Sequence, residues 1–164
     1  RKEIESTMAR VRRKLPDLAW RTTFIVGFPT ETDQDFEELV DFVSEGHFQH
    51  LGIFLYSDED NIRSSKYGDP IPLSLKEERK NRLMEIQQKI SREHHQKMVG
   101  SLQQVLVGGF SSETDLLLEG RNQYQGPEVD GVVYINEGNA TSAGFHQVEI
   151  TEAHEYDLVG KILN

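Results

Sequence analysis

The chain has 164 residues, 36% of them hydrophobic, with a formal charge of −10 and no cysteine. This length accommodates one ordinary domain or two small ones. No segment approaches the roughly 18 to 20 apolar residues of a membrane span, and the charged first residues are unlike a signal peptide, so we expect a cytoplasmic protein without a membrane partner. Without thiols the chain forms no disulfide and holds no iron–sulfur cluster through its own cysteines.

The negative charge is concentrated in the C-terminal part of the chain. Residues 100–164 carry ten Asp and Glu but only Arg121 and Lys161, a net charge of −8, whereas residues 1–99 carry −2. Affinity for nucleic acids depends on Lys and Arg that neutralise phosphates. The distribution therefore disfavours direct nucleic-acid binding and favours a basic partner.

Residues 1–60 predict alternating helices and strands. A first helix ends before Pro16, and residues 20–28 follow as an uninterrupted β-branched and aromatic run, which predicts a strand buried on both faces. Thr32 and Asp35 predict a capping box at the start of a second helix. Residues 51–56 predict a second buried strand, so the order indicates parallel strands joined by a crossover helix.

Two strands are too few for an α/β barrel, which needs roughly eight. We therefore expect a piece of such a barrel that lacks its N-terminal part. The apolar edge left open should make the chain self-associate through residues 1–60.

A polar loop is expected at residues 57–73, followed by a long helix that begins with a capping box at Ser74 and Glu77 and ends near Gly100. Lysines and arginines in residues 76–82 alternate with glutamates, which predicts a solvated helix face. His94 and His95 point about 100° apart on a helix, so we predict a solvated surface and no metal site.

From residue 102 onward the pattern changes to short apolar runs separated by turn residues such as Gly108-Gly109. Five short strands in such a segment predict a small, closed or partly open barrel of the OB kind. The strands are expected at residues 102–107, 116–119, 131–135, 145–150 and 156–162.

The end of the first strand has features of a binding site. Gly27 follows the strand and allows a ligand to approach the backbone, while Ile25, Phe28 and Pro29 offer an apolar wall for a flat ring. Active sites of α/β barrels lie at this edge of the strands. The alternative is an ordinary strand-to-helix turn with Glu31 near a helix N-terminus.

Residues 21–36, RTTFIVGFPTETDQDF, resemble the fifth-strand motif of radical-SAM methylthiotransferases, which usually reads IVGFPGET. Thr30 stands where the family has a second glycine. Residues 54–57, FLYS, resemble the sixth strand, whose backbone lies beside the adenine of S-adenosylmethionine. The resemblance implies that the cofactor-binding residues are Ile25, Gly27, Phe28, Phe54 and Tyr56.

Residues 125–134, QGPEVDGVVY, and 155–160, EYDLVG, resemble the TRAM domain of the RimO type, which modifies a ribosomal protein. An acidic domain suits a basic ribosomal protein better than RNA. The substrate-binding residues expected from this resemblance are Glu128, Asp130, Glu155 and Asp157.

The resemblance implies an α/β plus all-β chain in three parts: the end of a radical-SAM barrel at 1–73, a connecting helix at 74–99 and a TRAM barrel at 100–164. The intact enzyme would methylthiolate the β-carbon of an aspartate in small-subunit ribosomal protein twelve, with S-adenosylmethionine and two 4Fe-4S clusters. In the family the cluster cysteines lie upstream, so we expect no catalytic residue, metal ligand or bound cofactor in this chain, which should be inactive alone.

Two alternatives remain at this point. A transfer-RNA methylthiotransferase of the same superfamily would have an RNA substrate, and a non-catalytic module would use its β-barrel only to bind a protein. A Cys-x3-Cys-x2-Cys run encoded upstream of Arg1 would favour an enzyme, and an independent start codon would favour the module.

Overall fold

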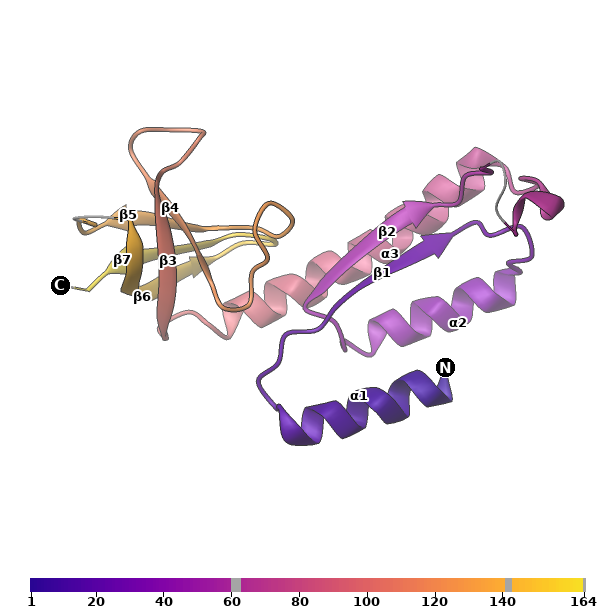
Figure 1. Cartoon of the computed structure of the whole chain (residues 1–164), viewed down its shortest axis with the longest axis horizontal. Helices are drawn as coiled ribbons and strands as arrows, with labels where there is room; N and C mark the ends of the chain where they lie inside the picture. Colours follow the sequence, from indigo (N-terminus) through magenta and orange to yellow (C-terminus); the bar gives the residue numbers. More distant parts are fainter. Residues whose placement is uncertain (60–62, 141–142, 164) are drawn as a thin grey trace.

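The computed structural model describes residues 1–59, 63–140 and 143–163. It consists of an α/β unit and a small β-barrel, and the long helix α3 (Leu73–Gln96) runs along the first and leads into the second (Figure 1). Residues 60–62 of the expected loop lie outside the described residues; the rest of it contains a short 3-10 helix, Ser65–Tyr67. None of the described helices is long and apolar enough to cross a membrane.

The α/β unit consists of α1 (Lys2–Lys14), β1 (Arg21–Val26), α2 (Asp33–Ser44) and β2 (His50–Leu55). The two strands are parallel and paired from Arg21 with His50 to Val26 with Leu55, which confirms the predicted crossover unit. The predicted capping box is also present, since the Thr32 hydroxyl accepts from the Asp35 amide and the Asp35 carboxylate accepts from the Thr32 amide.

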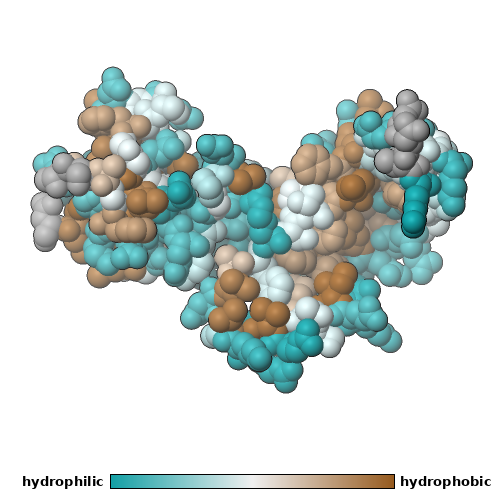
Figure 2. All heavy atoms as spheres, viewed as in Figure 1, coloured by the Kyte–Doolittle hydropathy of each residue, from teal (hydrophilic) through white to brown (hydrophobic). Residues whose placement is uncertain are grey.

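Helices α2 and α3 cover only one face of the two strands. Val26 and Ile53 point into the core between strands and helices, whereas Ile25 and Phe54 on the other face are 57% and 63% exposed. Figure 2 shows apolar residues gathered over β1 and β2. The prediction of strands buried on both faces was wrong for the described chain, because no element covers this second face.

Helix α1 packs against the outer side of α2. Met8 is buried against Phe42 and Phe48, and Trp20 packs at the edge of the same cluster. Arg12 adds a polar contact through Nη2, which donates to the carbonyl oxygen of His47 at 3.1 Å.

Helix α3 begins at Leu73 with Pro72 as its N-cap residue, and no side chain caps it. The predicted capping box at Ser74 and Glu77 was therefore wrong, because the helix starts before Ser74. The prediction of a solvated basic face was wrong for Lys76 and Arg79, which are only 2% and 3% exposed.

The C-terminal part is a closed five-stranded barrel in the order β3-β4-β5-β7-β6, which confirms the predicted fold. Val105, Val133, Val148, Ile150 and Leu158 form its core. Neighbouring strands are antiparallel except the parallel pair β5 and β7. The strands are β3 (Leu102–Phe110), β4 (Leu118–Asn122), β5 (Val133–Glu137), β6 (Gly144–Ala153) and β7 (Leu158–Ile162).

The first barrel strand is longer than predicted. It continues through Gly108-Gly109 to Phe110, with a shift in its register against β4 between Val107 and Gly109. Glycine in a strand often marks such a bulge, so it need not end the strand.

Candidate functional site

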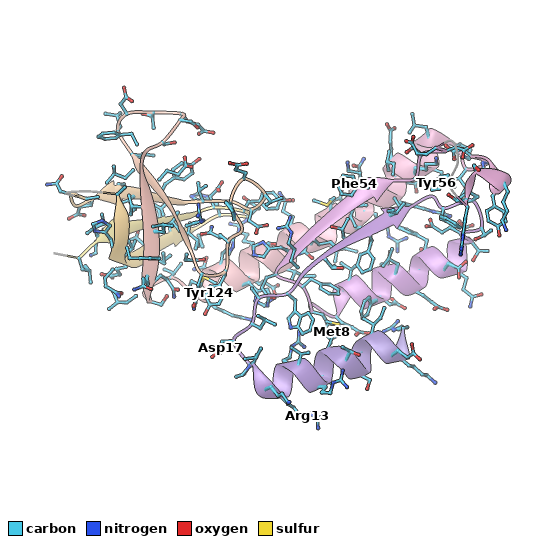
Figure 3. All side chains as sticks on the ribbon, in the orientation of Figure 1. Met8, Arg13, Asp17, Phe54, Tyr56 and Tyr124 are labelled. Atoms are coloured by element: carbon cyan, nitrogen blue, oxygen red, sulfur yellow. The ribbon has the colours of Figure 1, made fainter. Side chains whose placement is uncertain are left out.

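Four of the residues predicted to bind the cofactor lie near the carboxyl ends of the two parallel strands. Ile25 and Phe54 are register partners on the open face. The Phe28 and Tyr56 rings follow the strands and meet edge to face, with 5.3 Å between their centroids. In Figure 3, Phe54 and Tyr56 lie at the end of β2 that is remote from the barrel.

The fifth predicted residue, Gly27, has a structural reason to be glycine. Its φ of +78° lies in the left-handed region, and a Cβ atom there would overlap the Lys76 side chain. The space that we predicted for a ligand is therefore occupied by the aliphatic stem of a lysine from α3. The Gly27 amide also donates to both carboxylate oxygens of Glu31 at 3.1 Å, which holds the turn after β1.

Arg79 supports this turn from α3. Its guanidinium donates to Glu31 and, at 2.6 Å, to Asp33, and it lies 5.2 Å from the centre of the Phe36 ring. Because Glu31 in turn accepts from Gly27, the position of the β1 end depends on a buried cation.

Lys76 supports the end of β2 in the same way. Its Nζ atom donates to the carbonyl oxygen of Tyr56 at 2.8 Å and to Asp69 Oδ2 at 2.6 Å. Sequence reasoning missed both α3 cations. Lys76 and Arg79 precede Leu83 by seven and four residues, which places them on the buried stripe of the helix, and this spacing could have revealed them.

The open face of β1 and β2 is apolar near the ends of the strands. Ile25 and Phe54 expose adjacent apolar side chains, and the Tyr56 hydroxyl is buried without a hydrogen-bond partner among the described residues. In the part of the chain that the structure describes, no group of three or more His, Asp and Glu could hold a metal ion.

The acidic residues predicted to bind substrate have unequal environments. The Asp130 side chain is 6% exposed; it accepts from the Gly126 amide at 2.7 Å, pairs with Arg21 and lies 3.2 Å from His50 Nδ1. Asp130 thus joins the barrel to the first residues of β1 and β2.

Asp157 has an internal role as well, since it accepts from the Val132 amide at 2.8 Å. Glu155 is half-buried and lies 3.5 Å from Arg92 of α3. Glu128 is exposed and lines a groove of about 540 Å³ on the barrel, together with Glu119 and Arg121.

His95 completes the contact between α3 and the barrel. It is buried, and its Nδ1 lies 3.1 Å from the carbonyl oxygen of His154. Burial lowers the pKa of His95 below its usual value of 6.5. The predicted solvated surface was wrong for His95, because the barrel packs over this end of the helix, whereas His94 is half-buried.

Residues 99–163 match the TRAM domain family. The chain is 47% identical to "Ribosomal protein uS12 methylthiotransferase RimO" of Anaeromyxobacter sp. (strain K), over 98% of this chain and 34% of that protein. The proteins of the same name are 48% identical in Bdellovibrio bacteriovorus and 41% in Geobacter sulfurreducens, each over 99% of this chain and 36% of the relative. The chain spans about a third of the length of these relatives. Nearly the whole chain is therefore similar to the C-terminal part of RimO-type methylthiotransferases, and residues 99–163 match the TRAM domain.

Proposed function

We propose that this chain is the C-terminal part of an enzyme that methylthiolates the β-carbon of an aspartate in small-subunit ribosomal protein twelve, in the cytoplasm. The observation that carries the proposal is the identity of 41 to 48% with RimO proteins over almost the entire chain. Within that enzyme, residues 1–73 complete the cofactor pocket and the TRAM domain holds the protein substrate.

S-adenosylmethionine and two 4Fe-4S clusters supply the radical and sulfur chemistry when bound. The contribution of this chain is binding and orientation: Ile25 and Phe54 offer an apolar surface to the adenine, with Phe28 and Tyr56 at its rim. The Tyr56 hydroxyl itself is buried and has no hydrogen-bond partner among the described residues. Since the chain contains no cysteine, it supplies no thiolate to a cluster.

The TRAM domain attracts the substrate by charge. A net charge of −8 over residues 100–164 raises the encounter rate with a basic ribosomal protein and repels phosphate backbones. Glu128 and Glu155 expose enough of their carboxylates for direct contact, whereas Asp130 and Asp157 act by holding the loops that present them.

The intact protein, with its clusters reconstituted, should add a methylthio group to the ribosomal protein, as detected by mass spectrometry of its aspartate peptide. A transfer RNA offered under the same conditions should remain unmodified. Modification of the RNA alone would show that the enzyme is a transfer-RNA methylthiotransferase. Modification of neither substrate would favour a non-catalytic binding module.

The charge contribution has a matched test in the same enzyme. Glu128→Gln should weaken binding of the ribosomal protein more at low salt than at high salt, because exposed charges are screened. Asp115→Asn removes one exposed carboxylate from the hairpin between β3 and β4 and should have less effect. Equal effects of the two variants would indicate attraction by the general field and no contact at Glu128.

A further inference from the structure

The two buried cations of α3 each hold one of the strand ends that we propose for the cofactor. Arg79 reaches the β1 end through Glu31 and the Gly27 amide, and Lys76 donates directly to the Tyr56 carbonyl after β2. The two residues are three positions apart and therefore lie on one face of the helix.

Lys76 touches both strand ends. Its stem fills the space beside the Gly27 Cα atom, its ammonium bonds the Tyr56 carbonyl, and the same ammonium lies 5.5 Å from the centre of the Tyr56 ring. Asp69, in the segment before α3, supplies the counter-charge at 2.6 Å. One side chain thus connects the turn after β1, the end of β2 and the start of α3.

A lysine is a costly way to fill this space if stability alone is required. Removing an ammonium from water carries a desolvation penalty, and apolar residues of similar volume often replace buried ion pairs with no loss of stability. A methionine at this position would fill the cavity beside Gly27 but could not fix the direction of the Tyr56 carbonyl.

We propose that Lys76 is a positioning residue for S-adenosylmethionine. It fixes the backbone of Gly27 and Tyr56 at one separation, so that the Ile25 and Phe54 surface is preformed before the cofactor arrives. A preformed site binds more tightly because less ordering accompanies binding. This inference rests on the proposed function.

The test compares the intact, cluster-loaded enzyme with its Lys76→Met variant, and Lys89→Met, at an exposed position of the same helix, is the control. Isothermal titration gives the dissociation constant for S-adenosylmethionine, and calorimetric scanning gives the melting temperature. We expect Lys76→Met to weaken binding by about tenfold or more in a variant that is still folded at the titration temperature, and Lys89→Met to change neither binding nor melting temperature. Hydrogen exchange of the amides of residues 27, 28, 30 and 31 and of residues 56–59 should be faster in Lys76→Met.

Wild-type enzyme that does not bind S-adenosylmethionine would overturn the proposed function itself. Wild-type binding with an unchanged dissociation constant in Lys76→Met would overturn only the positioning role. If Lys76→Met does not fold, Asp69→Asn provides the answer, since it removes the counter-charge from a partly exposed position. Weaker binding in folded Asp69→Asn would support the role, and unchanged binding would refute it.

Discussion

Replacing Gly27 by alanine tests why the turn after β1 requires glycine. A non-glycine residue at a φ of +78° costs about 1–2 kcal/mol. The new methyl group would also overlap the Lys76 stem, which cannot swing away easily because its ammonium is held by Tyr56 and Asp69. Overpacking of this kind costs about 1–3 kcal/mol, so Gly27→Ala should lower the free energy of unfolding by roughly 2–5 kcal/mol.

Urea denaturation followed by fluorescence measures this effect in the α/β unit specifically, because Trp20 is the only tryptophan and packs there against the cluster of Met8, Phe42 and Phe48. Gly46→Ala is a matched control, since Gly46 has a φ of +71° but no atom within 4 Å of an added Cβ. It should cost only the backbone part, about 1–2 kcal/mol.

The overlap with Lys76 predicts a coupling in a double-mutant cycle. In a Lys76→Ala background, Gly27→Ala should cost only the backbone part, which leaves a coupling free energy of about 1–3 kcal/mol. Additive effects, within about 0.5 kcal/mol, would refute the role of the Lys76 stem. If Gly27 is required only so that a ligand can approach, the two substitutions should have additive effects on the free energy of unfolding of the unliganded chain.

Three further changes have defined outcomes. Asp130→Asn should weaken the contact between the barrel and the strands by only about 1 kcal/mol, because its partner Arg21 is partly exposed. Small-angle scattering of the variant should then show a broader range of shapes, and an unchanged scattering profile would contradict the contact. Because burial lowers the pKa of His95, the unfolded state takes up the proton first as pH falls. The stability that His95 contributes is therefore present above pH about 6.5 and is lost as the pH falls below it. The loss is about 1.4 kcal/mol per unit of pKa shift. A melting temperature that falls as steeply with acid in His95→Gln as in the wild type would refute this. We also propose that the chain self-associates through the open face of β1 and β2, so Phe54→Lys should lower the mass measured by light scattering, and a monomeric wild-type chain at high concentration would argue against it.

Local sequence signals predicted the elements whose stabilising contacts are themselves local. The capping box joins Thr32 and Asp35, three residues apart, and both partners are visible in the sequence. The number of barrel strands was also predictable, because alternating side chains and turn residues mark each strand over a few positions. Their bounds were less so, since β3 continues through Gly108-Gly109 and β4 lies at Leu118–Asn122, where we predicted 116–119. Their closure into a barrel followed from their number and brevity.

Residues that depend on distant partners were not predictable in this way. Arg79 is neutralised by Glu31, 48 positions earlier in the chain, and only the packing of α3 on the strands brings them together. Asp130 lies in a barrel loop that reads as exposed and acidic, yet it meets Arg21, which is 109 positions away. In both cases the sequence shows the charge but not the residue that buries it.

The arrangement of the two proposed sites constrains how a substrate can bind. Lys76 lies at the cofactor end of α3 and His95 at the barrel end, and 19 residues of helix span about 28 Å. Asp130 contacts the first residues of β1 and β2, whereas the proposed cofactor surface is at their last residues. A side chain bound by Glu128 or Glu155 therefore cannot be the one that reacts. The acidic barrel would hold a part of the ribosomal protein remote from the modified aspartate, so removing its charges should weaken binding of the whole protein and leave the reaction of a short aspartate-containing peptide unchanged.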